Sequence, residues 1–286
     1  AIKIARTYGE LNFEKKKYKI ITLENSFHGR TITTVKATGQ SSFHQSKFAP
    51  YPDGFSFNAI DDVYNAIDDE TVAVMIELVQ GEGGVFPFDK EKIKELAKFL
   101  KENDILLIID EVQTGVFRTG EFLASNLYDI EPDIITLAKG IGGGVPMGAV
   151  MTKHKDIWTA GDHGSTFGGN YLVTAAALEV LDILENLKDS GTLDETIIYF
   201  TKKLNDIFEA NRDIFITHVG LGLMRGLRVK DADTLASLIK TAFEFGVMVL
   251  KSGNNTLRFL PALTISKSEI DEGFIRLQKA ITKIKS

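Results

Sequence analysis

Two short apolar runs, each followed closely by a polar residue, constrain the fold of this chain most strongly. The first run covers residues 105–109 and leads directly into Asp110. The second covers residues 134–137 and is followed by Lys139 and a glycine-rich stretch, residues 140–144. Runs of this length, bounded by polar residues, are typical of strands buried on both faces of a parallel sheet. We therefore expect Asp110 and Lys139 at the carboxyl ends of strands, where open α/β sheets bind their ligands.

An acid and a lysine at the ends of two buried strands fit the chemistry of pyridoxal phosphate (PLP). The lysine forms the Schiff base with PLP, and the acid keeps the pyridine nitrogen protonated so that the ring can act as an electron sink. Other motifs are missing: there is no Walker A loop and no G-x-S-x-G elbow, and the five histidines do not fall at zinc spacing. Gly220, Gly222 and Gly226 are spaced one residue too far for a dinucleotide fingerprint.

Composition narrows the class of protein further. A chain of 286 residues can bury a large core, and its net charge of −6 provides no basic surface for nucleic acid. The absence of cysteine excludes disulfides and a cysteine-ligated zinc and is compatible with a reducing compartment, so we expect a cytoplasmic protein. No apolar run approaches the ~18 residues of a membrane span, so no membrane partner is expected.

The order of the elements predicts an α/β fold with two domains. Buried strands are expected at residues 19–23, 72–76, 105–109, 134–137 and 149–152, with a helix that begins at Asp89 between the second and the third. Residues 50–58 are expected to be irregular. We expect residues 1–188 to form a large domain with a mostly parallel central sheet and helices on both faces. Residues 189–286 should form a smaller α+β domain, with strands near 223–229, 247–250 and 257–260 and a final helix capped by Ser266.

Two polar segments allow either a structural or a functional interpretation on their residues alone. In residues 24–31, Phe27 fits a core position and Arg30 a surface charge. In residues 161–170, the backbone amides beside glycines and the hydroxyls of Ser165 and Thr166 could bind a phosphate, but the same stretch also fits a plain surface turn.

The motifs taken together resemble those of class III (subgroup II) PLP-dependent aminotransferases. The resemblance runs from FHGRTITTVKATGQ (27–40) and VQGEGGV (79–85) through DEVQTG (110–115) and PDIITLAKGIGGGVPMGA (132–149) to GDHGSTFGGN (161–170) and TLRFLPAL (256–263). Each motif alone is weak, whereas the set is highly specific and spans essentially the whole chain. It implies PLP-dependent transferase fold type I and a homodimer with shared active sites. The first, fourth and fifth motifs are most similar to those of members that act on N2-acetylornithine in arginine biosynthesis, with 2-oxoglutarate and glutamate as the other substrates.

The resemblance also implies a role for each motif residue. Lys139 corresponds to the Schiff-base lysine, and Asp110 to the partner of the pyridine nitrogen. Phe27 and Val112 correspond to residues that contact the two faces of the cofactor ring. Gln113 corresponds to a residue near the phenolic oxygen of the cofactor. Ser165 and Thr166 correspond to the loop that reaches the phosphate of the neighbouring subunit's cofactor. For the substrates, Arg30 and Arg258 correspond to arginines that bind carboxylates, and Glu82 to the acid that pairs with Arg258.

The sequence departs from the family pattern at several positions. Leu78 and Tyr171 stand where the family commonly has proline, and Phe117 where it usually has glycine. The family's S-G-[AT]-E phosphate loop is absent from residues 1–286, and residues 1–6 are typical of the middle or end of an amphipathic helix. We therefore expect the full polypeptide to begin before Ala1.

Other functions remain open on the sequence alone. The alternatives within the family are ornithine, succinylornithine or 4-aminobutyrate aminotransferase activity and an aminomutase, with succinyldiaminopimelate as a further substrate. The loop 161–170 argues against the 4-aminobutyrate type, and the set of Arg30, Glu82 and Arg258 argues against the aminomutase. The contrasting class is a non-catalytic α/β protein that binds a phosphorylated ligand, in which Lys139 would contact phosphate instead of acting as a nucleophile.

Overall fold

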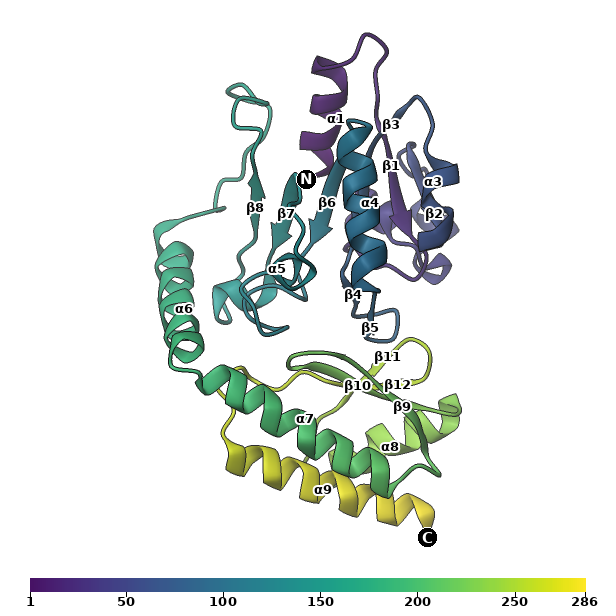
Figure 1. Cartoon of the computed structure of the whole chain (residues 1–286), viewed down its shortest axis with the longest axis vertical. Helices are drawn as coiled ribbons and strands as arrows, with labels where there is room; N and C mark the ends of the chain where they lie inside the picture. The colour runs from purple at the N-terminus through teal and green to yellow at the C-terminus, as the bar shows by residue number, and fades with distance from the viewer. The chain divides into compact units, whose positions relative to one another are not determined.

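A computed structural model describes residues 1–286, which form two compact units (Figure 1). Unit 1 consists of residues 1–78, 88–116 and 123–180, and unit 2 of residues 79–87, 117–122 and 181–286. The helix α6 (Tyr171–Asp189) contains the point at which the chain passes from unit 1 into unit 2. The domain boundary expected between residues 188 and 189 stays a prediction.

Unit 1 is built on a six-stranded sheet with the order β2-β1-β3-β6-β7-β8. Neighbouring strands are parallel except for the antiparallel pair β7 and β8. The mostly parallel sheet predicted from the apolar runs is therefore confirmed. The strands are β1 (Lys19–Leu23), β2 (Phe55–Asn58), β3 (Thr71–Ile76), β6 (Leu106–Asp110), β7 (Ile134–Leu137) and β8 (Ala149–Thr152).

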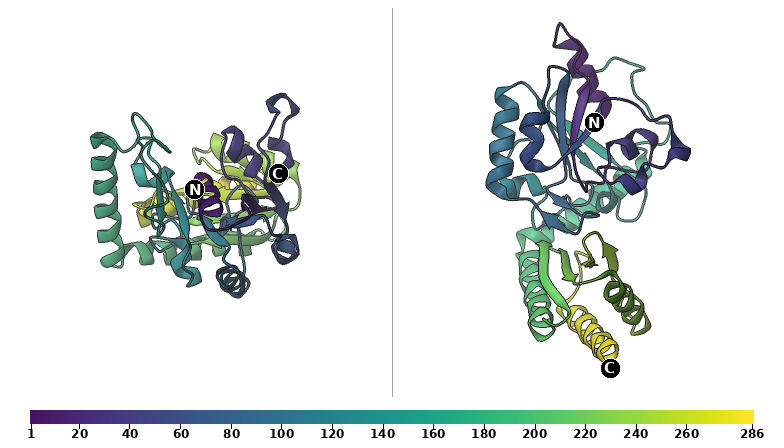
Figure 2. Two further views of the ribbon diagram at one scale, coloured as in Figure 1. Left: turned by 90° about the horizontal axis from the view of Figure 1, so that it is seen from above. Right: turned by 90° about the vertical axis from the view of Figure 1, so that its right-hand side faces the viewer.

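Helices cover both faces of this sheet (Figure 2). Ile4 and Ala5 of α1 pack with Ile20, Met75 and Ile108 on one face. Side chains alternate along a strand, so the intervening residues point to the other face, where α4 packs against β6 with its buried apolar residues. The helices of unit 1, besides the first part of α6, are α1 (Ile2–Leu11), α2 (Ile32–Ala37), α3 (Val63–Ala66), α4 (Lys90–Glu102) and α5 (Ala124–Tyr128), with short 3-10 turns at Ser41–Phe43, Ser46–Phe48, Ile60–Asp62 and Lys139–Gly142.

Unit 2 combines an antiparallel sheet with long helices, as the sequence predicted for the C-terminal part. Its four-stranded sheet has the order β11-β12-β10-β9, and a separate two-stranded ribbon pairs β4 with β5. Helix α9 packs against both α7 and α8 (Figure 1). The elements are β4 (Val79–Gln80), β5 (Phe86–Pro87), α7 (Thr192–Ala210), β9 (Phe215–Leu221), β10 (Met224–Val229), α8 (Ala232–Glu244), β11 (Leu250–Ser252), β12 (Thr256–Phe259) and α9 (Lys267–Lys285).

Two helix starts confirm the capping predicted from the sequence. The side chain of Asp89 accepts a hydrogen bond from the Lys92 amide at 3.0 Å, at the first turn of α4. Ser266 and Glu269 form a reciprocal capping box at the start of α9. Each such cap satisfies helix N–H groups that have no partner within the helix and contributes about 1 kcal/mol.

Two expectations for strands were wrong. Residues 55–58 form β2, a parallel edge strand beside β1, instead of irregular loop. The strand expected at residues 247–250 begins only at Leu250 and continues to Ser252. Both are short edge strands, paired with the rest of their sheet on one side only. Such strands carry a weaker apolar signal than central ones, because less of their surface is buried.

Phe117, where glycine was expected, has a backbone conformation that glycine adopts more easily than other residues. Phe117 has φ of +63°, and Val116 before it has φ of +55°. Glycine adopts this left-handed region freely, whereas other residues meet a steric cost of about 1–2 kcal/mol. Phe117 is buried at 5% exposure, and its ring lies 5.7 Å from that of Phe122. Burial of a phenylalanine stabilises by about 1.5–3 kcal/mol, which offsets the strain.

Tyr128, at the end of α5, has a buried hydroxyl whose ionisation can be measured. Its hydroxyl donates towards the carbonyls of Phe88, at 2.8 Å, and Leu78, at 3.2 Å. Burial, with the nearby charges of Asp89 and Glu111, raises the pKa of Tyr128 to about 12. The folded state therefore holds this proton more tightly than the unfolded state, whose pKa is about 10.

We expect the stability that Tyr128 contributes to be complete below about pH 10 and to be lost as the pH rises towards 12. In the Tyr128→Phe variant, alkaline titration followed at 295 nm should lack one phenolate that ionises near pH 12 in the wild type. The variant should also be about 1 kcal/mol less stable at pH 8, because it lacks one hydrogen bond. Loss of a phenolate that ionises near pH 10 would contradict the assignment.

Candidate active site

Asp110 lies at the carboxyl end of β6 and is 8% exposed. Its Oδ1 accepts hydrogen bonds from the Val112 amide at 3.1 Å and the Thr136 hydroxyl at 3.0 Å. Its Oδ2 lies 2.8 Å from Nδ1 of His28. Burial would raise the pKa of Asp110, but the hydrogen bond and charge of His28, aided by Val112 and Thr136, outweigh it and hold that pKa below its usual range. The site therefore contains a buried, ionised carboxylate.

Glu111, the next residue, has a structural role instead. It is 1% exposed and accepts hydrogen bonds from the amides of Ala124, at 3.0 Å, and Ser125, at 2.8 Å, and from the hydroxyls of Ser125 and Thr114. These bonds anchor the first turn of α5. The two adjacent acids point to opposite sides of the chain, as residues at a strand end do, so only Asp110 remains available for a ligand.

Lys139 follows the strand next to β6. The register of the sheet pairs Asp110 with Thr136, and Lys139 lies three residues beyond Thr136 along the chain. Lys139 is exposed and has φ of +50°, a left-handed conformation that costs a non-glycine residue about 1–3 kcal/mol. Lys139 therefore lies just beyond the end of β7, on the same edge of the sheet as Asp110.

The segment after β1 brings Phe27 and Arg30 to this edge. The Phe27 amide donates to Oε2 of Glu77, at 2.9 Å, just beyond β3. The Arg30 guanidinium lies 5.5 Å from the Phe27 ring centre and 4.6 Å from that of Phe43, within the range of a cation–π contact. Gly29 has φ of +130°, and a Cβ there would lie 2.6 Å from the Thr34 hydroxyl. Glycine is therefore required between His28 and Arg30.

The remaining cofactor residues predicted from the sequence differ in their setting. Val112 and Gln113 are half-buried in the turn directly after Asp110, close to the carboxylate in the chain. Ser165 and Thr166 lie in a loop that is exposed throughout residues 161–169, where the Ser165 hydroxyl accepts a bond from the Gly168 amide at 3.0 Å. The role of this loop in a neighbouring subunit stays a prediction.

In unit 2, the structure pairs Arg258 with Glu82. Nη1 of Arg258 lies 2.8 Å from Oε1 of Glu82 and 3.0 Å from the Gly81 carbonyl. The Arg258 side chain is 9% exposed and that of Glu82 is 34% exposed, so the pair is open on the side of the carboxylate. A guanidinium in this arrangement can exchange its internal carboxylate for one from a ligand.

The β11–β12 hairpin positions this pair. Asn254 and Asn255 both have φ near +50°, which suits the tight turn between the two strands. Ser252 of the hairpin donates to the Gly81 carbonyl at 2.7 Å, and Asn254 donates to the Gly83 carbonyl at 2.9 Å. These bonds hold the loop that carries Glu82 against the strand that carries Arg258.

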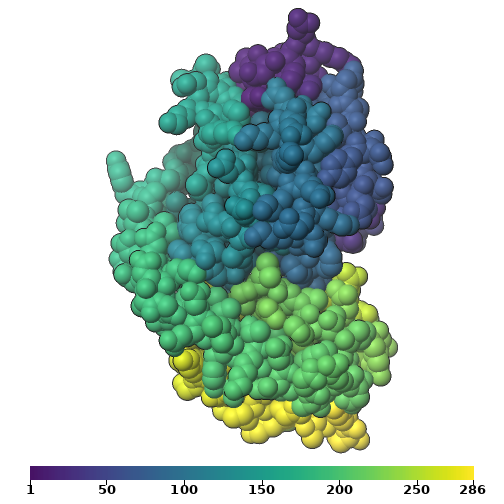
Figure 3. Space-filling model, viewed as in Figure 1, coloured from purple at the N-terminus to yellow at the C-terminus, as the bar shows by residue number.

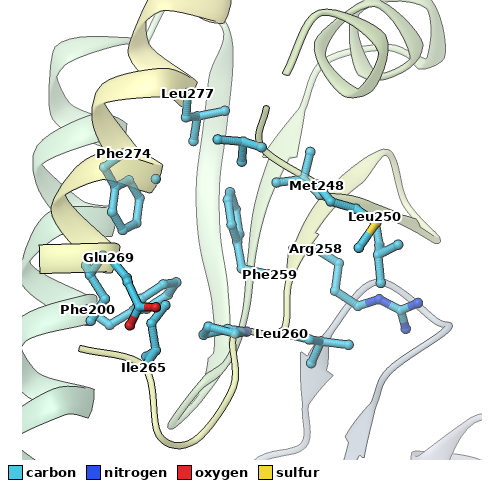
Figure 4. Close-up of a pocket in the computed structure, with 15 residues that line it drawn as sticks. Phe200, Met248, Leu250, Arg258, Phe259, Leu260, Ile265, Glu269, Phe274 and Leu277 are labelled. Atoms are coloured by element: carbon cyan, nitrogen blue, oxygen red, sulfur yellow. The ribbon is translucent and has the colours of Figure 1, made fainter. Parts of the chain in front are cut away.

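Unit 2 contains a pocket of about 280 Å³ that has Arg258 among its lining residues (Figure 4). Its walls are mainly aromatic and aliphatic, with Phe200, Phe259, Phe274 and Leu277 among them. The stem of Arg258 lines the pocket, whereas its guanidinium points away from the aromatic rings. The guanidinium of Arg258, which contacts Glu82, therefore lies outside this apolar pocket.

The residues of unit 1 fit PLP. A buried, ionised Asp110 needs a positive partner, which a protonated pyridine nitrogen would supply. Lys139 would hold the aldehyde carbon, and Phe27 directly precedes His28, which contacts Asp110. His28 is the site residue that sequence reasoning missed, because its partner Asp110 lies 82 positions away in the chain.

Other kinds of site are not supported. No group of three or more histidine, cysteine or acidic side chains is arranged to hold a metal ion. No helix of the structure has the length and apolar character that crossing a membrane would require.

Comparisons with known proteins identify the family of this chain. The family "Aminotransferase class-III" matches residues 1–281. An acetylornithine aminotransferase of Wolinella succinogenes is 56% identical, over 99% of this chain and 72% of that protein. A succinylornithine transaminase of Salmonella paratyphi B is 41% identical, over 100% of this chain and 71% of that protein.

A solved structure extends the agreement to the fold. The ornithine aminotransferase of Toxoplasma gondii superposes with a TM-score of 0.91 at 29% identity, covering 99% of this chain and 70% of that one. The family match, the sequence identities and the similarity of fold all indicate one family. The chain belongs to the class-III aminotransferase family.

Proposed function

We propose that this protein transfers the ω-amino group of N2-acetylornithine to 2-oxoglutarate, in arginine biosynthesis, with PLP as cofactor. The observation that carries amino transfer is the register of β6 and β7, which brings Asp110 and Lys139 to the same edge of the sheet. The choice of acetylornithine rests on the 56% identity to a relative of that name.

Each residue that would contact the bound cofactor has a separate role in this proposal. The bound cofactor would supply an aldehyde that takes up the amino group and a ring that withdraws electrons. Nζ of Lys139 would hold the cofactor before substrate arrives and afterwards carry a proton from the substrate carbon. Asp110 would keep the ring nitrogen protonated, while Phe27 and Val112 would hold the two ring faces and Gln113 the phenolic oxygen.

Recognition of two different substrates would depend on the Glu82–Arg258 pair. With 2-oxoglutarate or glutamate, Arg258 would release Glu82 and bind the α-carboxylate of the substrate instead. With acetylornithine, whose reacting end carries no carboxylate, the internal pair would stay closed. Arg30 would bind the carboxylate at the far end of either substrate.

Single-turnover kinetics of the Glu82→Ala variant test this switch. Without Glu82, Arg258 no longer has to break a charged hydrogen bond before it binds glutamate. The rate with glutamate relative to acetylornithine should therefore rise roughly 10-fold or more. The matched control is Glu272→Ala, which removes the acid of the exposed Glu272–Arg276 pair in α9 and should leave the ratio unchanged. An unchanged ratio in Glu82→Ala would remove the switch from the proposal.

Values of kcat/KM for a panel of substrates determine which acyl group on the substrate the enzyme prefers. We expect the highest kcat/KM with acetylornithine, and lower values with succinylornithine and ornithine. A preference for succinylornithine would favour the activity named for the Salmonella relative instead.

We also propose that the enzyme works as a homodimer with shared sites, in which Ser165 and Thr166 bind the phosphate of the partner's cofactor. Supporting this, large apolar side chains are exposed around the start of α6, with Phe167 at 80%, Tyr171 at 95% and Leu172 at 73%. This segment, green in Figure 3, lies at the surface of the molecule. Exposed apolar side chains gathered in this way are typical of subunit interfaces. We expect the molecular mass measured in solution to be that of a dimer.

A further inference from the structure

Phe43 contacts Arg30 but has no part in the roles proposed above. It is the last residue of the 3-10 turn Ser41–Phe43 and is half-buried. Its ring centre lies 4.6 Å from Cζ of Arg30, closer than the ring of Phe27, which lies 5.5 Å away. The two rings pack edge to face, with their centres 5.3 Å apart. The Arg30 guanidinium therefore contacts a pair of packed aromatic rings.

Hydrogen bonds on both sides of Phe43 fix the position of its turn. Before the turn, the side-chain amide of Gln40 donates to the Ser26 carbonyl at 3.2 Å. After the turn, Nε2 of His44 lies 3.0 Å from the Val35 carbonyl of α2. Neither bond involves the guanidinium. The turn that carries Phe43 is thus held independently of the arginine that it contacts.

Arg30 keeps its hydrogen-bond donors free. It is exposed, and its guanidinium contacts the two rings without forming a hydrogen bond or an ion pair to the chain. The charge of a guanidinium attracts aromatic faces, whereas its N–H donors lie around its edge. Aromatic rings therefore restrain the group without occupying its donors. An arginine held in this way can bind a carboxylate without first breaking an internal hydrogen bond.

Arg258 is held in the opposite way. Its Nη1 lies 2.8 Å from Oε1 of Glu82, so a ligand carboxylate has to displace an internal one. That arrangement suits a carboxylate that only some substrates carry at the reacting end. The arrangement at Arg30 suits a carboxylate that every substrate carries at its far end.

We propose that Phe43 is a positioning residue for substrate binding, which together with Phe27 holds the Arg30 guanidinium ready for the carboxylate at the far end of the substrate. The inference rests on the proposed role of Arg30 and adds a residue to it. Phe43 acts through Arg30 and does not contact the reacting atoms. Because Phe27 would also contact the cofactor, Phe43 is the position at which the hold on Arg30 can be changed alone.

Three variants separate an aromatic role of Phe43 from a packing role. Phe43→Leu removes the aromatic face and keeps an apolar side chain, whereas Phe43→Tyr keeps the face. The matched control is Phe48→Leu, in the next 3-10 turn, Ser46–Phe48. The ring of Phe48 lies 5.2 Å from Nζ of Lys47, so this control removes a cation–π contact that does not involve Arg30.

The expected effect is on substrate binding and not on the chemical step. In Phe43→Leu, the arginine has to be ordered when the substrate binds, so KM for acetylornithine and for 2-oxoglutarate should rise about 3- to 10-fold. The kcat should stay within about twofold of the wild type, because Arg30 does not contact the reacting atoms. Phe43→Tyr and Phe48→Leu should both resemble the wild type.

A binding measurement without turnover uses glutarate, a dicarboxylate that has no group to react. Isothermal titration calorimetry of the PLP-loaded protein should show glutarate binding about 3- to 10-fold more weakly to Phe43→Leu than to the wild type. Affinity for Phe43→Tyr should be unchanged. This comparison does not depend on any step of amino transfer.

A double-mutant cycle shows whether Phe43 acts through Arg30. Arg30→Met removes the cation and should itself raise KM for acetylornithine. Once the cation is absent, adding Phe43→Leu should change that KM by less than about twofold, because the ring has no guanidinium left to hold.

The remaining outcomes contradict either this inference or the proposal beneath it. Equal losses from Phe43→Leu with and without Arg30 would show a packing role and overturn the inference, as would wild-type KM in Phe43→Leu or a loss in Phe43→Tyr equal to that in Phe43→Leu. Unchanged KM in Arg30→Met would instead remove the proposed role of Arg30, and the inference would fall with it. If Phe43→Leu does not fold, Phe43→Met, which also lacks an aromatic face, provides the same comparison.

Discussion

The Lys139→Ala variant is expected to lose amino transfer by about 10⁴-fold or more, because one amine serves both as the nucleophile and as the proton carrier. Lys139 is exposed at the end of β7, so its removal should leave the fold unchanged. The left-handed backbone there is strained for alanine as for lysine, and thermal stability should change little. Steady-state and single-turnover rates with acetylornithine provide the measurement.

Two controls separate chemistry from charge. Lys139→Arg keeps a positive charge at the strand end, but its guanidinium does not deprotonate and cannot act as a nucleophile. This variant should be about as inactive as Lys139→Ala. Lys155→Ala removes another exposed lysine, outside the site, and should keep wild-type activity. Activity of Lys139→Ala within tenfold of the wild type would exclude Lys139 as the catalytic amine.

The second large effect is expected for Asp110→Asn. The change keeps the shape of the side chain but removes the charge opposite the ring nitrogen. Breaking a buried ion pair by removing one partner costs about 3–5 kcal/mol. Since each 1.36 kcal/mol corresponds to tenfold in rate, kcat should fall by about 10²- to 10⁴-fold.

Glu111 is the matched control for Asp110, since it is the adjacent acid and is also buried. Its carboxylate anchors the first turn of α5 and has no proposed contact with the cofactor. Glu111→Gln should lower the free energy of unfolding by about 1–3 kcal/mol but leave kcat within a few-fold. Equal losses of activity in the two variants would indicate a general loss of structure instead of a loss of charge at the ring.

The central elements of the fold were predictable because their sequences carry one unambiguous signal. The apolar runs that became β3, β6 and β7 are buried on both faces, and this leaves an unbroken pattern in the chain. The caps at Asp89 and Ser266 were predictable for a similar reason, because each is a local interaction of a few residues. Residues 55–58 gave no such signal, since β2 is a short edge strand whose pairing depends on β1, more than 30 positions earlier.

The site was predictable only where a residue and its role lie in one motif. Asp110 and Lys139 follow their strands directly, so the pattern of the strands locates both. The contact of His28 with Asp110 joins two motifs that are 82 residues apart, and no local pattern indicates which way an imidazole points. The strain at Lys139 and Phe117 was equally hidden, because left-handed backbone at a non-glycine residue depends on the packing around it.

The most direct test of this account locates the cofactor on the chain. The protein is incubated with PLP, reduced with borohydride, which fixes the cofactor to the amine that holds it, and then digested for mass spectrometry. The account predicts a stoichiometric adduct on Lys139 and none in the Lys139→Ala variant. An adduct on another lysine, or no adduct at all, would contradict it.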